Sequence, residues 1–206
     1  MRVERLGGFA FAIKDREVNV APSLATYFCP YLAAQVEKLS KMDYARLVRR
    51  FGYTIRTGQA LHKLIEALDP RCVKEPMLRD EELKIGGKPD FLCLDESGTA
   101  AVIEFKSELN DAWLEAKLWT LRKYMALAAR KYNAEAAVGA LYGILDGKHI
   151  EITLTRRQLD AEYEDLRRRV ESARSPTPAK TRGPWCAHCV LRAKCRAKKP
   201  AAAIQP

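Results

Sequence analysis

The sequence lacks any long apolar run. Of its 206 residues 48% are hydrophobic, yet the apolar stretches are short, far below the ~18 residues that a membrane helix needs. A signal-peptide core is also missing, because charged residues return directly after the apolar stretch 7–13. We therefore expect a cytoplasmic protein with no membrane insertion. The length fits one domain with an appendage, and the composition allows a buried core.

Acidic residues are almost absent from the last fifth of the chain. Residues 1–166 hold 25 basic and 25 acidic side chains, whereas residues 167–206 hold 11 basic ones and a single acid, Glu171. The whole net charge of +10 therefore lies in this final segment. Such asymmetry indicates a polyanionic partner, with nucleic acid the first candidate and an acidic membrane surface the second. A solvated basic tail explains the composition equally well.

Hydrophobic periodicity predicts alternating helices and strands. Helices are expected over 22–39 with an interruption at Pro30, 43–51, 58–68, 110–131 and 156–174, and hairpins over 83–106 and 136–154. The Pro-rich segment 175–184 is typical of a linker. The sum is an α/β domain over 1–174, with a mixed β-sheet flanked by helices. Residues 175–206 then form a linker, a small C-terminal cysteine module and a basic tail.

Three cysteines lie close together near the C-terminus, as Cys186, Cys189 and Cys195 in a C-x2-C-x5-C pattern. In a reducing compartment such thiols bind a metal or an iron–sulfur cluster, because a disulfide network would be reduced. Three thiolates leave a four-coordinate centre one ligand short. The candidates for the fourth ligand are His188, Cys29, Cys72 and Cys93. A distant cysteine is easier to accommodate than His188, which stands between two ligands. Cys93, in mid-strand, is most simply a small buried hydrophobic residue.

Three charged residues stand in and beside two apolar strands, at Asp90, Glu104 and Lys106. Glu104 and Lys106 are two residues apart, so in a strand their side chains leave the same face of the sheet. A hairpin lets Asp90 lie beside them. Carboxylates there can hold a divalent cation, and the lysine can orient an attacking water. The alternative is a structural ion pair between Glu104 and Lys106. Charges are rarely buried without a partner or a function, and we favour a function.

The Asp…Glu-x-Lys arrangement resembles the PD-(D/E)XK nuclease superfamily, and more closely its RecB-like branch. That resemblance implies a restriction-endonuclease-like fold. The branch has a metal-binding histidine on an upstream helix, which Thr57–Leu64 matches with His62. Its downstream Gln-x3-Tyr motif is half present, because Tyr124 occupies the tyrosine position and Thr120 stands where the family has Gln.

The placement of the cysteines makes the family resemblance more specific. RecB-like nucleases with an iron–sulfur cluster carry one cysteine in an N-terminal helix and three near the C-terminus. The sequence is similar to the CRISPR-associated exonuclease family (Cas four) in this pattern. The resemblance implies a cluster, [4Fe–4S] or else [2Fe–2S], on four cysteines: Cys29, Cys186, Cys189 and Cys195.

What the resemblance implies is a metal-dependent DNA exonuclease that prefers single strands and acts in CRISPR adaptation beside the integrase subunits. It assigns Mn²⁺ or Mg²⁺ to His62, Asp90, Glu104 and the Phe105 carbonyl. Lys106 would position the attacking water, with Tyr124 nearby. Two other classes stay open. One is a zinc-binding nucleic-acid module without catalysis, and the other is a PD-(D/E)XK repair or restriction nuclease.

Overall fold

The chain is described by a computed structural model that covers residues 2–6, 9–13, 20–21, 24–38, 72–109, 112–189, 191–192 and 195. Its N-terminal strands β1 (Arg2–Leu6), β2 (Phe9–Ile13) and β3 (Val20–Ala21) form a small antiparallel sheet. The 3-10 helix η1 (Leu24–Phe28) and the helix α1 (Pro30–Glu37) follow. The helices expected over 43–51 and 58–68 lie outside the described residues.

The central sheet has five strands in the order β10-β9-β8-β7-β4. They are β4 (Cys72–Lys74), β7 (Phe91–Leu94), β8 (Thr99–Lys106), β9 (Ala136–Gly143) and β10 (His149–Thr155). Strands β8 and β9 are parallel, and the other neighbouring pairs are antiparallel. The parallel pair needs a crossover, which the helix α4 (Leu114–Tyr132) supplies. The predicted mixed sheet with flanking helices is therefore confirmed.

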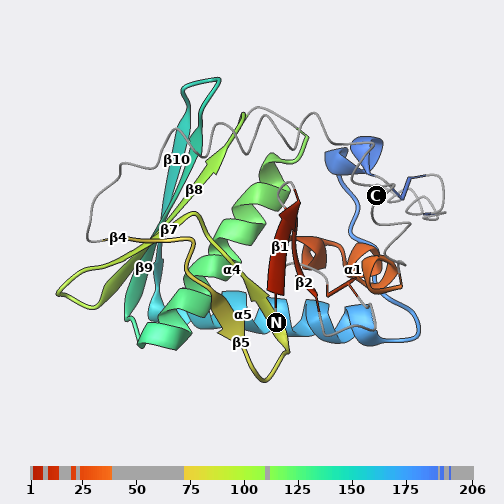
Figure 1. Cartoon of the computed structure of the whole chain (residues 1–206), viewed down its shortest axis with the longest axis horizontal. Helices are drawn as coiled ribbons and strands as arrows, with labels where there is room; N and C mark the ends of the chain where they lie inside the picture. Colours follow the sequence, from red (N-terminus) through yellow and green to blue (C-terminus); the bar gives the residue numbers. More distant parts are fainter. Residues whose placement is uncertain are drawn as a thin grey trace, which may run out of the picture.

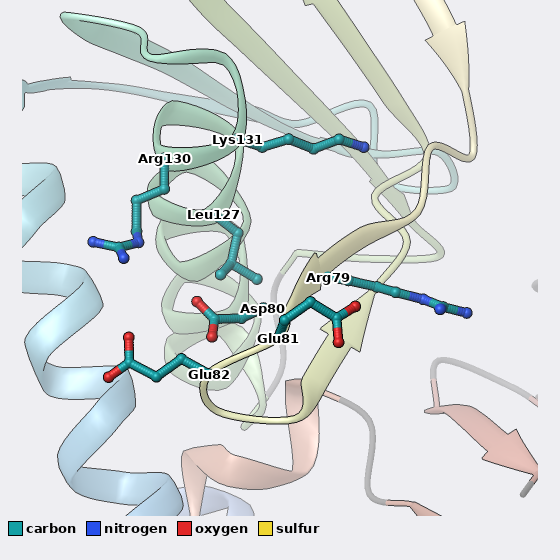
Figure 2. Close-up of a pocket in the computed structure, with 7 residues that line it drawn as sticks. All are labelled: Arg79, Asp80, Glu81, Glu82, Leu127, Arg130 and Lys131. Atoms are coloured by element: carbon teal, nitrogen blue, oxygen red, sulfur yellow. The ribbon is translucent and has the colours of Figure 1, made fainter.

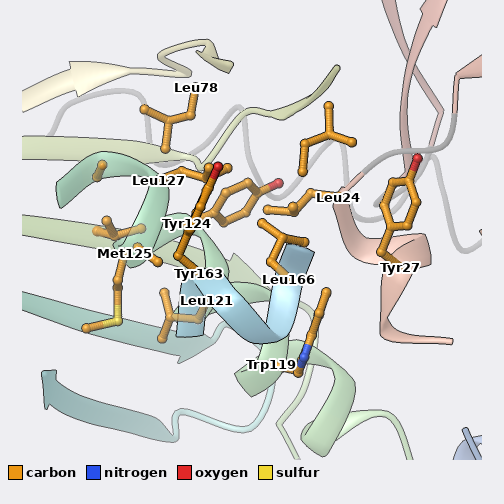
Figure 3. Packing of buried hydrophobic residues seen from close by; sticks show 14 of the residues in the cluster. Leu24, Tyr27, Leu78, Trp119, Leu121, Tyr124, Met125, Leu127, Tyr163 and Leu166 are labelled. Carbon is orange, nitrogen blue, oxygen red and sulfur yellow. The ribbon is translucent and has the colours of Figure 1, made fainter. Parts of the chain in front are cut away.

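Two long helices cover one face of this sheet (Figure 1). Helix α4 packs on β8 and β9, and α5 (Arg156–Arg174) packs against α4 and α1. Contact between α4 and β9 is close because Gly139 has no side chain. An added Cβ there would lie 2.5 Å from the Met125 sulfur. The interior that results holds Leu121, Met125 and Leu166, all fully buried (Figure 3).

A two-stranded hairpin leads into the central sheet. It consists of β5 (Leu78–Asp80) and β6 (Ile85–Gly87). The hairpin expected over 83–106 is shorter than predicted: it pairs β7 with β8, and residues 85–87 form β6 in a different sheet. Pro89 lies between β6 and β7, and a proline has no N–H to donate to a strand ladder. The helix expected over 22–39 is interrupted at Pro30 as predicted, because Cys29 separates η1 from α1.

Cys72 and Cys93 form a disulfide. They lie directly opposite each other on the antiparallel strands β4 and β7, with their Cα atoms 4.2 Å apart. The expectation that Cys93 is a small buried hydrophobic residue is wrong, since its half-buried side chain is bonded to the edge strand.

Within the described residues, no helix combines the length and the apolarity needed to cross a bilayer.

A buried ion cluster joins α4 to α5. Lys123 is completely buried and forms ion pairs with Glu162 and with Asp165, the latter at 2.7 Å. Asp165 also accepts a hydrogen bond from the Trp119 indole N–H at 2.9 Å. Burial favours the neutral acid, but the bonds from Lys123 and Trp119, together with the charges of Lys123 and Arg169, outweigh it and lower the pKa of Asp165 to about 2.

The lowered pKa of Asp165 predicts an acid-sensitive contribution to stability. The folded pKa lies below the ordinary value of 3.8, so the contribution is complete above pH 4 and is lost as pH falls toward 2. We expect Asp165→Asn to be less stable than the parent protein at pH 7. About 2 kcal/mol of that difference should vanish near pH 2. Urea unfolding at several pH values measures it, with the exposed Glu164→Gln as control. A difference independent of pH would contradict the prediction.

Candidate active site

Two carboxylates are held against each other where β7 begins beside the end of β8. Because Phe91 pairs with Ile103, the preceding residue Asp90 faces Glu104. The Asp90 N–H donates to Glu104 Oε1 at 3.1 Å, and the Phe105 N–H donates to Asp90 Oδ2 at 2.8 Å. Both acids are buried, with 6% and 5% of their surface exposed. Each carboxylate is thus fixed by the backbone beside the other.

Lys106 completes the group. Its ammonium forms an ion pair with Glu104 Oε2, as expected for side chains two residues apart on one strand. The side chain stays 26% exposed. The structure therefore brings Asp90, Glu104 and Lys106 to one point, half open to solvent on the lysine side.

The charges of this site do not balance, because the two carboxylates of Asp90 and Glu104 lie beside one ammonium, that of Lys106. Burial first, and then repulsion from Asp90, raise the pKa of Glu104 to about 7, although Lys106 and the Asp90 N–H oppose the shift. A divalent cation between the two carboxylates would remove this cost, because both could then ionise. The donors present therefore suit a hard cation. His62, the further predicted ligand, lies outside the described residues.

Helix α4 presents Tyr124 to the strand that leads into Asp90. Tyr124 is 7% exposed and packs against Gly87, where an added Cβ would lie 2.5 Å from Tyr124 Cε1. Thr120, one turn earlier, is also buried, and its hydroxyl donates to the Ala116 carbonyl at 2.8 Å. The threonine hydroxyl thus forms a bond within its own helix, and Tyr124 is the residue of this pair that contacts the approach to the site.

One residue that anchors the site cannot be recognised from the sequence. Asp146, in the turn between β9 and β10, accepts a hydrogen bond from the Leu109 N–H at 2.9 Å. The Ile144 N–H also donates to the Lys106 carbonyl at 2.9 Å. Together these bonds fix the segment directly after Lys106. The sequence predicts a turn at Asp146, but nothing in it indicates a partner 37 residues earlier.

Cys29 lies beside the C-terminal cysteine module. Its backbone is extended, with φ −121° and ψ 104°, as the residue before a proline prefers. The preceding Phe28 packs edge-to-face on Trp185 with the ring centroids 4.6 Å apart. Trp185 in turn precedes Cys186 in the 3-10 helix η2 (Pro184–His188). Cys29 also packs in a small apolar cluster that includes Leu191.

The four predicted cluster cysteines are all free and half-buried: Cys29, Cys186, Cys189 and Cys195. Burial raises the pKa of the Cys189 thiol, the Leu191 N–H lowers it, and each of the other three thiols raises it further. In the described part of the chain, no group of three or more His, Cys, Asp or Glu side chains is already arranged to ligate a metal ion.

A separate pocket of about 240 Å³ lies between α4 and the β5–β6 turn (Figure 2). It is lined by Arg79, Asp80, Glu81, Glu82, Leu127, Arg130 and Lys131. Its three acids balance its three cations. Asp80 accepts the Tyr163 hydroxyl at 2.8 Å, and Lys131 donates to the Met77 carbonyl at 3.0 Å. These hydrogen bonds hold neighbouring helices and strands together, so we assign no ligand to this pocket.

The fold and the paired carboxylates with a lysine define an α/β protein with the donor set of a metal-dependent hydrolase. Residues 13–196 match the model of the PD-(D/E)XK nuclease superfamily, and the chain belongs to that superfamily. Its members are typically metal-dependent nucleases that use divalent ions such as Mg²⁺ or Mn²⁺. The expectation of a restriction-endonuclease-like fold is thereby confirmed.

Among solved structures, the crystal structure of SSO0001 matches with a TM-score of 0.55 and 18% sequence identity. The match covers 90% of each chain. At this identity the likeness concerns the fold. A search of curated proteins gives no match.

The contact between Gly87 and Tyr124 can be tested directly. Gly87→Ala should destabilise the protein by about 1–3 kcal/mol, because its methyl group overlaps the tyrosine ring. Tyr124→Leu removes the ring, so the double variant should cost less than the sum of the single variants. Denaturant unfolding of the four proteins measures the coupling. Additive effects would show that the two residues do not restrain each other.

Proposed function

We propose that this protein is a metal-dependent DNA exonuclease that hydrolyses phosphodiester bonds, with a preference for single strands. The observation that carries the proposal is the convergence of Asp90, Glu104 and Lys106 in a half-open site. Membership of the nuclease superfamily supports the reaction class. The exonuclease mode and the strand preference come from the family resemblance of the sequence.

The chemistry follows from the placement of these groups. Mn²⁺ or Mg²⁺ would be held by Asp90, Glu104, the Phe105 carbonyl and His62. When bound, the ion supplies charge stabilisation to the phosphate under attack. Lys106 carries the exposed positive charge of the site, so it can orient the attacking water and offset charge on the phosphate. The backbone bonds between Asp90 and Phe105 keep the carboxylates in place before substrate binds.

Cations for DNA binding are available near the C-terminus. Arg168, Lys180, Arg182 and Arg192 are exposed, and phosphate contacts of such side chains supply most non-specific affinity for DNA. Arg174 is exposed as well, but its Nη2 donates to the distant Leu83 carbonyl at 2.7 Å and so contributes to the fold. The basic segment predicted from sequence is thus divided between the two tasks.

The catalytic assignment predicts three inactive variants. Asp90→Asn, Glu104→Gln and Lys106→Met should each lower the rate of cleavage of single-stranded DNA by about a hundredfold or more. Affinity for DNA should change little, because we assign most of the phosphate contacts to the exposed basic residues near the C-terminus. Single-turnover cleavage and fluorescence anisotropy measure the two quantities.

A chelator should reproduce the loss of activity, and Mn²⁺ or Mg²⁺ should restore it. Glu104→Gln serves as its own folding control. Because burial and Asp90 disfavour the Glu104 charge, this variant should be at least as stable as the parent protein in metal-free buffer at pH 8. Unimpaired cleavage by Glu104→Gln, or in excess chelator, would refute the assignment.

We further propose that Cys29, Cys186, Cys189 and Cys195 hold an iron–sulfur cluster, with [4Fe–4S] preferred over [2Fe–2S]. The packing of Phe28 on Trp185 supports this ligand set, because it brings the chain before Cys29 beside the chain before Cys186. Four cysteine thiolates are the ligand set that such a cluster requires. A nuclease with this one-and-three cysteine pattern fits a role in CRISPR adaptation beside the integrase subunits.

The ligand set predicts which variants lose iron. Cys29→Ala, purified without oxygen, should be colourless and should melt at a lower temperature, because one missing thiolate releases the cluster. The double variant Cys72→Ser/Cys93→Ser is the matched control, since it removes the disulfide and leaves the four cluster thiols untouched. It should keep its iron. Iron and zinc analysis with visible absorption measures the outcome. Zinc in place of iron would support the zinc-module alternative, and full iron in Cys29→Ala would refute the ligand set.

A further inference from the structure

Arg169, on α5, contacts both segments that carry the cluster cysteines. Its Nη1 donates to the Phe28 carbonyl, directly before Cys29. The same nitrogen donates to Thr181 Oγ1 at 3.3 Å, in the linker that leads to Cys186. One guanidinium therefore joins two parts of the chain that are about 150 residues apart in sequence.

The guanidinium is itself held rigidly. Its Nε donates to both oxygens of Asp165, at 3.2 and 3.1 Å. Its carbon lies 5.6 Å from the Phe28 ring centroid and 5.1 Å from that of Trp119. The side chain is 23% exposed. A planar fork stacked on aromatic rings and bonded on both edges cannot be reproduced by a lysine.

The linker is tied in beside Arg169. The Thr181 carbonyl lies 3.8 Å from the Cys186 sulfur, as acceptor of a thiol hydrogen bond. The Tyr31 N–H, two residues after Cys29, donates to the Ala179 carbonyl at 2.9 Å. Thus the backbone on both sides of the proposed cluster is fixed close to the place where Arg169 bonds.

We infer that Arg169 is a positioning residue that holds Cys29 beside the C-terminal cysteine loop and so prepares the ligand set for the cluster. The inference rests on the cluster proposed above. Gathering four thiolates is costly because like charges repel, and a site whose backbone is already in place loses less entropy when metal binds. Outer partners of this kind typically change metal affinity by about 10–100-fold.

The test compares Arg169→Gln and Arg169→Lys with the parent protein, all as full chains purified without oxygen. The readouts are the iron content per chain and the rate at which a chelator bleaches the visible absorption. We expect Arg169→Gln to lose its cluster about tenfold faster, with little rescue by Arg169→Lys. Arg168→Gln is the matched control, because Arg168 is the neighbouring residue, is 69% exposed, and forms a long ion pair with Asp165, at 3.8 Å.

A second control separates positioning from simple destabilisation. Leu159→Ala removes a fully buried side chain from the same helix and should lower the melting temperature without accelerating cluster loss. Thr181→Val removes one acceptor of Arg169, so its effect should not add to that of Arg169→Gln. If Arg169→Gln bleaches no faster than Arg168→Gln, or no faster than Leu159→Ala, the inference is overturned while the cluster stands. If the parent protein holds no iron, the cluster proposal fails and the inference falls with it.

Discussion

The buried ammonium of Lys123 is the interaction on which both candidate sites depend. It lies between α4 and α5 with Glu162 and Asp165 as its partners. Removing one partner of such a buried pair costs about 3–5 kcal/mol, because the remaining charge is left without compensation. Helix α4 carries Tyr124 to the carboxylate site, and α5 carries Arg169 to the cysteine module. A change in how these two helices pack therefore reaches both sites.

Asp90 and Glu104 show the opposite balance, since their arrangement costs stability and suits the metal ion proposed for them. Two carboxylates that share a buried position repel each other, and the raised pKa of Glu104 expresses that repulsion. Lys106 offsets only part of it. Such an arrangement persists in a folded protein when the rest of the structure determines it, here through the Asp90 and Phe105 amides. It also explains why this site, and not the charge-balanced pocket at Asp80, is suited to a cation.

The sequence predicts the carboxylate site because strand geometry is local. Two residues on one strand share a face whatever surrounds them, so the Glu104–Lys106 pair follows from spacing alone. The Cys72–Cys93 disulfide cannot be predicted in this way, because β4 has only three residues and its sequence shows no alternation that identifies a strand. The ion pairs of Lys123 cannot be predicted for another reason. Their acidic partners are 39 and 42 residues away in sequence, and only the packing of α4 on α5 brings them together. The division at Pro89, in contrast, follows from chemistry visible in the sequence.

The surroundings of Cys29 can be predicted from the sequence in part only. The sequence contains the local cause of its conformation, because Pro30 keeps the preceding residue extended and separates η1 from α1. It does not contain the contact of Phe28 with Trp185, which depends on the linker returning across α5. A cluster held by Cys29 and Cys186 would close a loop of about 157 residues. Closing such a long loop lowers the conformational entropy of the unfolded chain strongly. The same restriction would hold η1 and α1 against η2. On the proposals made above, the cysteine module would fix the N-terminal helices to α5, and Asp90, Glu104 and Lys106 would carry the hydrolytic chemistry.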